Sequence, residues 1–249
     1  MFRRRFGYSG KRQIERVVRS IAERKFLDSR QTCTANTTNR VDRSGSIYLL
    51  TQIDQGSTDS ERIGDKVTGT SLQLNLIAVN PGYVNDTEGG VQYMPLQSYF
   101  LRVLVFIWKD DTPPTPDSVL SNGVADSNFA GVTAMLDHDL KVKRKLIMDE
   151  TFTLYSDTTS QITGTPEPVL SKPYGGSFKP HMLIKRSFDL TKLRNRLNVI
   201  NYSGGQATDG INSIYILLIS NAALDTTPTP DLNTCWNVHF NTRYNYIDM

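Results

Sequence analysis

At 249 residues, the chain is long enough for one large β-sandwich or for two smaller domains. Its hydrophobic content of 38%, with 10 Phe, 11 Tyr and 2 Trp, can fill a core and argues against global disorder. No stretch approaches the roughly 18 consecutive apolar residues of a membrane span. The net charge of +3 is uneven, because residues 1–30 hold ten Lys or Arg and three acids, whereas the remainder holds 18 basic and 22 acidic residues. Positive charge is therefore concentrated in the N-terminal segment.

The first ten residues include three consecutive arginines and show no periodicity, which is typical of a flexible basic tail. From Lys11 to Leu27, apolar residues recur at spacings of three and four, which predicts a short amphipathic helix with an arginine-rich face. Basic side chains neutralise phosphates and release counterions, so we predict that this segment binds nucleic acid. The predicted contact residues are Arg3, Arg4, Arg5, Lys11, Arg12, Arg16, Arg19, Arg24 and Lys25. The aromatic side chains predicted to stack on bases are Phe2, Phe6 and Tyr8.

Two alternatives stay open for this segment. One is a helix that faces solvent or a protein partner and meets no polyanion. The other is a mitochondrial transit peptide, against which the acids Glu15, Glu23 and Asp28 count. The clusters Arg3–Arg5 and Lys11–Arg12 also fit a nuclear import signal.

Strand patterns fill the rest of the chain. Residues 31–46, rich in Thr and Asn, are expected to form a linker before a short strand over 47–53. A loop dense in Gly, Ser, Thr and Asp then leads into Leu72, Leu74 and Leu76, which alternate with polar residues as in a half-buried strand. Similar alternation, or apolar runs, continue to the C-terminus. The eight predicted strands cover residues 68–79, 98–109, 132–138, 143–155, 181–190, 197–203, 213–220 and 235–247.

Eight strands joined by polar, proline-rich connections, with no long helix after residue 27, do not fit a βαβ fold. They predict an all-β fold, an eight-stranded antiparallel jelly roll whose two sheets form a β-sandwich. We expect a basic N-terminal arm over residues 1–30, a linker over 31–46 and a jelly-roll domain over 47–249. The long connections, expected to be exposed and to carry recognition, cover residues 80–97, 109–131 and 156–180.

Residues for a catalytic or metal site are sparse. Cys33 and Cys235 lie far apart, so two reduced thiols are favoured over a disulfide, and the absence of an apolar leader favours an intracellular, reducing setting. His138, His181 and His239 have no metal-ligand spacing, and there is no phosphate-binding loop or nucleophile elbow. We expect no enzyme activity, no metal and no cofactor.

Two weaker possibilities involve carboxylates. Asp110–Asp111 or Asp149–Glu150 would suit a jelly-roll hydrolase if two carboxyl groups lay about 5 to 10 Å apart across a groove. Asp59 and Glu61 offer oxygen ligands for calcium at a subunit contact.

Residues 55–66 read Q-G-x5-R-I-G-x-K before a predicted strand, and residues 100–120 place a buried strand before a proline-rich loop. With the basic arm, the run V-K-R-K-L-I-M-D-E-T-F over 142–152 and two terminal strands, this order resembles the capsid proteins of circular, Rep-encoding single-stranded DNA (CRESS-DNA) viruses. That group includes circovirus-like and geminivirus-like agents, and the coat protein of satellite tobacco necrosis virus is more distantly similar. The arm is shorter and less arginine-rich than in many circovirus capsids, and the cysteines and histidine of a geminivirus-type zinc site are lacking.

The resemblance implies a structural capsid protein whose copies, about 60 in the T=1 arrangement, assemble into a small icosahedral shell with the arm on packaged single-stranded DNA. It implies as partners further copies of the chain, the genome, a host nuclear import receptor and a cell-surface receptor, but no membrane. The implied locations are the virion and the host nucleus. The alternative is a cellular β-sandwich module that binds carbohydrate or nucleic acid.

Charge sets a further expectation. About 60 arms of charge +7 supply about 420 positive charges, fewer than the phosphates of a genome of a few thousand nucleotides. Other basic residues or bound ions must therefore supply the remainder. The candidates noted in the sequence are Lys141, Lys143, Arg144 and Lys145.

Overall fold

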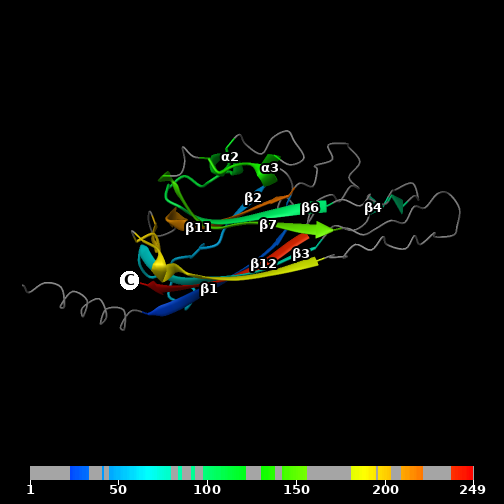
Figure 1. The fold of residues 1–249 in the computed structure, drawn as a ribbon. Helices are drawn as coiled ribbons and strands as arrows, with labels where there is room; N and C mark the ends of the chain where they lie inside the picture. The colour runs from blue at the N-terminus through cyan, green and yellow to red at the C-terminus, as the bar shows by residue number, and fades with distance from the viewer. Residues whose placement is uncertain are drawn as a thin grey trace, which may run out of the picture.

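The structure, a computed structural model, describes residues 23–33, 41, 45–79, 84–85, 91–92, 98–121, 130–137, 142–155, 181–194, 196–202, 209–220 and 237–248. Most of these residues form two antiparallel sheets that lie face to face, with two short helices over one of them (Figure 1), and residues 84–85 and 91–92 pair as a separate two-stranded sheet. The strands are β1 (Arg24–Cys33), β2 (Ser46–Leu49), β3 (Lys66–Val79), β4 (Val84–Asn85), β5 (Val91–Gln92), β6 (Ser98–Trp108), β7 (Arg144–Tyr155), β8 (His181–Asp189), β9 (Val199–Tyr202), β10 (Gly210–Ile211), β11 (Ser213–Ser220) and β12 (Asn237–Asp248). The helical elements are α2 (Pro116–Val119), α3 (Ala130–Thr133) and the 3-10 turn η2 (Leu190–Lys192). Within the described ranges, no helix is long and apolar enough to cross a membrane.

The strand pairing defines the fold. One sheet, the β1 sheet, has the order β1-β12-β3, with β8 and β9 both pairing with β3 and β10 beside β9. The other, the β2 sheet, has the order β2-β11-β6-β7. Among the eight principal strands the first pairs with the last (β1–β12), and the pairs β2–β11, β3–β8 and β6–β7 follow inward along the chain. This is a long antiparallel hairpin rolled into two sheets, so the predicted eight-stranded jelly roll is confirmed.

The core lies between the two sheets because alternate side chains of each strand point inward. Leu72, Leu74 and Leu76 of β3 are fully buried, as are Val103 and Val105 of β6. Burial of each such side chain contributes about 1.5–3 kcal/mol to folding. The alternation seen in the sequence at β3 therefore identifies its core face correctly.

A β-bulge lies where β3 and β12 pair, with the register shift between Asn245 and Tyr246. Gly69, opposite Tyr246, packs against the buried Tyr244, and a Cβ at Gly69 would lie 2.4 Å from the Tyr244 hydroxyl. A glycine at this position therefore allows the aromatic ring to enter the core.

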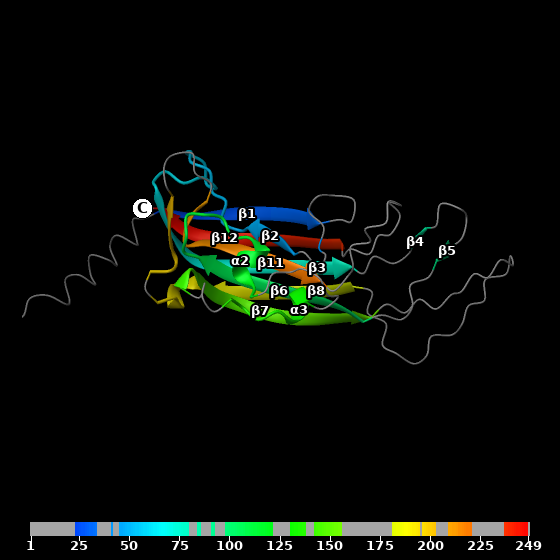
Figure 2. The same ribbon diagram turned by 90° about the horizontal axis from the view of Figure 1, so that it is seen from above.

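The outer face of the β2 sheet is covered. Phe106 and Trp108 of β6 and Leu217 of β11 form a second apolar cluster with residues around α2 and α3. Figures 1 and 2 show these helices over that sheet. Arg102, the lone charge noted in the apolar β6 sequence, donates 2.8 and 2.7 Å hydrogen bonds to Asp149 and a 2.5 Å hydrogen bond to the carbonyl of Ala134. It therefore fastens the covering segment to the sheet.

Several predicted elements need correction. Residues 24–27, expected to end a helix, and residues 31–33, expected in the linker, belong to strand β1. Residues 132–138 do not form a strand, since α3 ends at Thr133 and only Leu136 makes an isolated bridge with Leu120. The predicted strand over 197–203 is the short β9 at the edge of β3. Of the predicted strands, only residues 132–138 form none, and the short strand expected over 47–53 is β2, whereas β1 and the short β4, β5 and β10 were not predicted.

Candidate functional site

The segment Gln55–Lys66, which carries the motif singled out in the sequence, forms a compact loop before β3. The amide of Gly56 donates to the carbonyl of Arg62 at 2.9 Å, and the amide of Arg62 donates to the carbonyl of Asp54 at 2.9 Å. Inside the loop, the amide of Thr58 donates to the Glu61 carboxylate at 2.9 Å. Hydrogen bonds from Thr58 hold the pKa of the Glu61 carboxyl below its usual value.

Arg62 anchors this loop to the body of the protein through its buried side chain. Its side chain is fully buried, and its Nη1 donates to the carbonyl of Gly64 at 2.7 Å and lies 3.4 Å from the Asp65 carboxylate. The guanidinium also lies 4.2 Å from the centroid of the Tyr202 ring. A buried cation requires such compensation, here from a carbonyl, a carboxylate and an aromatic face.

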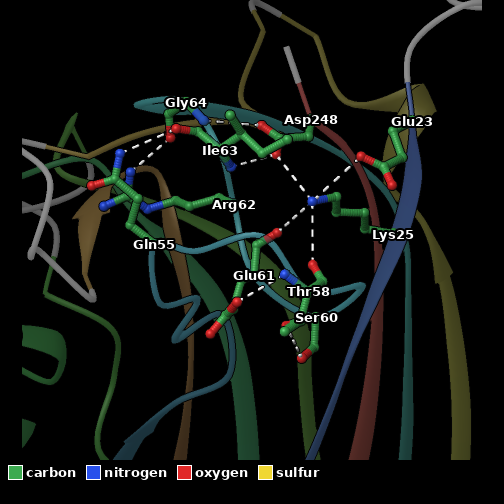
Figure 3. Close-up of polar contacts among 10 residues, drawn as sticks. All are labelled: Glu23, Lys25, Gln55, Thr58, Ser60, Glu61, Arg62, Ile63, Gly64 and Asp248. Atoms are coloured by element: carbon green, nitrogen blue, oxygen red, sulfur yellow. Dashed lines mark hydrogen bonds and ion pairs between the residues drawn. The ribbon is translucent and has the colours of Figure 1, made fainter.

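Lys25 and Asp248 connect the same loop to the first and last strands (Figure 3). The Lys25 ammonium donates to the carbonyl of Glu61 at 2.8 Å and to that of Thr58 at 3.3 Å. It also lies 3.6 Å from the Asp248 carboxylate, which accepts a 2.6 Å hydrogen bond from the amide of Ile63. We call the Asp54–Asp65 loop together with Lys25 and Asp248 the arm-root clasp, because it holds the end of the sandwich at which the basic segment joins β1.

The structure describes two of the predicted contact residues, Arg24 and Lys25, and only Lys25 belongs to the clasp. Arg24 is exposed at the start of β1, whereas the Lys25 side chain is only 2% exposed and is surrounded by oxygen atoms. The Lys25 ammonium is therefore engaged inside the fold, and we do not include Lys25 among the proposed nucleic-acid contacts. The remaining contact residues, together with the three aromatic residues predicted to stack, lie outside the described residues; they are Arg3, Arg4, Arg5, Lys11, Arg12, Arg16, Arg19, Phe2, Phe6 and Tyr8.

The second basic cluster noted in the sequence is largely engaged. Lys143 lies 2.5 Å from the Asp110 carboxylate, and Arg144 is buried with its guanidinium donating to the carbonyls of Val119 and Asp137. Lys145 is exposed, and Lys141 lies outside the described residues. A basic run in the sequence is thus divided by the fold into structural and solvent-facing members.

Three of the candidate carboxylates, Asp110, Asp149 and Glu150, are held by basic side chains. Asp149 binds Arg102 through both oxygens, and Glu150 binds Arg186 through both oxygens at 3.0 and 2.5 Å. Asp110 is paired with Lys143 as above, and Glu61 accepts from Thr58. Among the described residues, no three His, Cys, Asp or Glu side chains gather as a metal site would require.

The other single residues have structural surroundings. Cys33 is buried and donates to the Tyr48 hydroxyl at 3.0 Å, and burial raises the pKa of its thiol. Cys235 and His138 lie outside the described residues. His239 contacts Thr32 across two neighbouring strands, at 3.2 Å between Nδ1 and Oγ1.

Sequence reasoning missed the partners of the motif rather than the motif. Lys25 is 36 residues from Glu61, and Asp248 is 185 residues from Ile63. The one usable signal was local, namely that Arg62 is followed by an apolar residue and a glycine shortly before a strand. Contacts between residues so far apart in the sequence become apparent only once the pairing of β1 with β12 is known.

The fold and the clasp together define an antiparallel jelly-roll protein whose basic N-terminal segment joins the body at one end of the sandwich. The chain matches no protein-family model and no curated protein. Among solved structures it is similar to a parvovirus (densovirus) from Galleria mellonella, at 10% sequence identity and a TM-score of 0.26, over 100% of this chain and 88% of that chain. A likeness at this TM-score carries no argument about function, which therefore has to be argued from the residues of this chain.

Proposed function

We propose that this protein is a structural, non-enzymatic capsid protein of a small single-stranded DNA virus of the CRESS-DNA type that it resembles. Its copies self-assemble into a closed icosahedral shell, about 60 in the T=1 arrangement, and its N-terminal arm packages the genome. The proposed locations are the virion and, during assembly, the host nucleus, with Arg3–Arg5 and Lys11–Arg12 read by an import receptor.

The observation that carries this proposal is the separation of charge along the chain. Ten basic and three acidic residues fall in residues 1–30, whereas the remainder of the chain has a net negative charge. Of the predicted contact residues that the structure describes, only the side chain of Lys25 is engaged in contacts within the fold. A concentrated basic segment attached to a folded body is what electrostatic binding of a polyanion requires.

The proposed DNA contacts are Arg3, Arg4, Arg5, Lys11, Arg12, Arg16, Arg19 and Arg24. The non-enzymatic role is supported by the carboxylate pairs, since Asp149 and Glu150 each bind an arginine through both oxygens. A catalytic carboxyl group of a hydrolase has to present an oxygen to its substrate, whereas both oxygens of Asp149 and of Glu150 are already engaged.

The test is assembly of the purified full-length protein, followed by negative-stain electron microscopy and by the 260/280 nm absorbance ratio after nuclease treatment. We expect uniform particles about 20 nm across, the size expected for a shell of about 60 domains of this length, with protected nucleic acid. A monomer or small oligomer that stays unassembled after single-stranded DNA is added would contradict the proposal. That result would favour the cellular β-sandwich module that binds carbohydrate or nucleic acid.

A further inference from the structure

The outward sides of the two sheets differ in chemistry. The β2 sheet turns Phe106, Trp108 and Leu217 outward, and the covering segment with α2 and α3 buries them. Figure 1 shows no described element over the outward side of the β1 sheet. That side carries mainly amide, hydroxyl and charged side chains, with Phe26 and Leu183 as its large exposed hydrophobic residues, so most of it is stable in water without a protein cover.

The register of the strands aligns these side chains in rows. Arg30 of β1 lies opposite Asn241 of β12, Asn241 lies opposite Asn75 of β3, and Asn75 lies opposite Lys185 of β8. All four side chains are exposed. With neighbouring strands about 4.8 Å apart, the row spans about 14 Å and has a cation at each end. We call the outward side of β1, β12, β3 and β8, centred on this row, the polar outer face.

The charge on the polar outer face is positive. Its acids are Asp28 and Asp189, and both already have basic partners: Asp28 binds Arg243 at 2.7 and 2.6 Å, and Asp189 lies 3.3 Å from Lys192. In the part of the chain that the structure describes, the exposed side chains of Arg24, Arg30 and Lys185 have no carboxylate partner. Among the residues that the structure describes, these three basic groups are therefore not neutralised by an acid.

The row next to this one adds donors and an aromatic neighbour. Arg243 lies opposite Gln73, and Gln73 lies opposite Ser187. The Arg243 guanidinium lies 5.2 Å from the centroid of the Phe26 ring, which is 44% exposed. Spaced cations hold phosphates, amides and hydroxyls bind phosphate or base edges, and an exposed ring offers a stacking surface. A flat sheet with this combination suits a single strand, whose bases are free to stack.

We propose that the polar outer face is a second contact surface for single-stranded nucleic acid, which adjoins the basic residues that precede β1. This inference rests on the proposed function, in which the arm already holds single-stranded DNA. The polar outer face adjoins the arm, because β1 begins at Arg24 and the six residues to Arg30 extend about 20 Å along the face. Lys185 of β8 also supplies a cation beyond the ten of residues 1–30, and the charge of a whole genome requires such further cations.

The test measures binding of full-length protein to poly-dT of about 30 nucleotides across a salt series. The variant Arg30→Gln/Lys185→Gln removes the two ends of the row, and Lys109→Gln/Arg194→Gln removes two charges outside the strands of the polar outer face as a matched control. Each lost phosphate contact makes the negative slope of log K against log salt shallower by about 0.7, so we expect its magnitude to fall by about 1.4 for the first variant and to stay unchanged for the control. A second variant, Asn75→Asp/Asn241→Asp, should weaken binding further by placing two negative charges at the centre of the row.

Slopes equal to that of the wild-type protein in both polar-face variants would overturn the proposal. An equal slope change with duplex DNA would overturn the assignment to single strands. A reduced slope in a protein that never forms particles would leave the polar outer face standing while the capsid role fails, so the two proposals can fail separately.

Discussion

Arg62 is the residue on which the arm-root clasp depends most. Its buried guanidinium holds the carbonyl of Gly64 and stacks on Tyr202. Replacing it by Met removes a charge-assisted hydrogen bond and a cation–π contact at once. We predict that Arg62→Met lowers the free energy of unfolding by about 2–4 kcal/mol, measured by urea denaturation.

The matched control is Arg186→Met. Arg186 is 40% exposed in its side chain and pairs with a Glu150 side chain that is 36% exposed, so solvent screens the interaction. Its loss should lower the free energy of unfolding by less than about 1 kcal/mol. Equal effects at the two arginines would show that the clasp contributes no more than a surface ion pair.

The sequence identifies residues of the arm-root clasp but not the partners that they contact. The motif around Arg62 stands out because glycine and arginine interrupt a polar loop before a strand. That Lys25 turns inward could not be predicted, because it lies in a basic run whose other members read as solvent-facing. Its burial follows from β1 pairing with β12, which brings Asp248 within 3.6 Å of its ammonium.

Strand β1 is the element whose position changes how the arm should be tested. A deletion of residues 1–30 would remove seven of its ten residues, including Lys25 of the clasp. We predict that this variant aggregates or melts at a much lower temperature, because β12 loses its neighbour and becomes a free edge. A deletion of residues 1–22 stops before β1 and should retain the melting temperature of the full-length protein. Equal melting temperatures for both deletions would contradict a structural role of β1.

The reason β1 escaped prediction lies in its inward side. The residues that alternate toward the core are Lys25, Leu27, Ser29, Gln31 and Cys33, so polar side chains hide the period of two. The opposite error arose at residues 132–138. There Val132, Ala134 and Leu136 alternate because they pack on the outer cluster of the β2 sheet, not because they pair in a ladder. Strands with a clear apolar alternation or run, such as β3 and β11, were predicted within about two residues at each end.

For the molecule as a whole, acid should weaken the fold. Hydrogen bonds from Arg243, Thr58, Lys143 and Thr191 are the largest cause of the lowered pKa of Asp28, Glu61, Asp110 and Asp189, respectively. A carboxyl whose pKa is lower in the folded state stabilises the protein above its unfolded pKa of about 4, and this contribution is lost as the pH falls through the folded value. We predict that the melting temperature of the protein falls from pH of about 5 to about 2.5. A melting temperature unchanged over that range would contradict these pairings.

The central claim is that a jelly-roll body forms a shell while the basic N-terminal segment holds the genome. The most direct measurement compares nuclease-protected nucleic acid per particle for the full-length protein and the 1–22 deletion, with circular dichroism as a control for the fold. We predict that both variants keep the β body and that the deletion loses most of the protected nucleic acid, because seven of the eight proposed arm contacts are removed. Equal protected nucleic acid in the two variants would contradict the account.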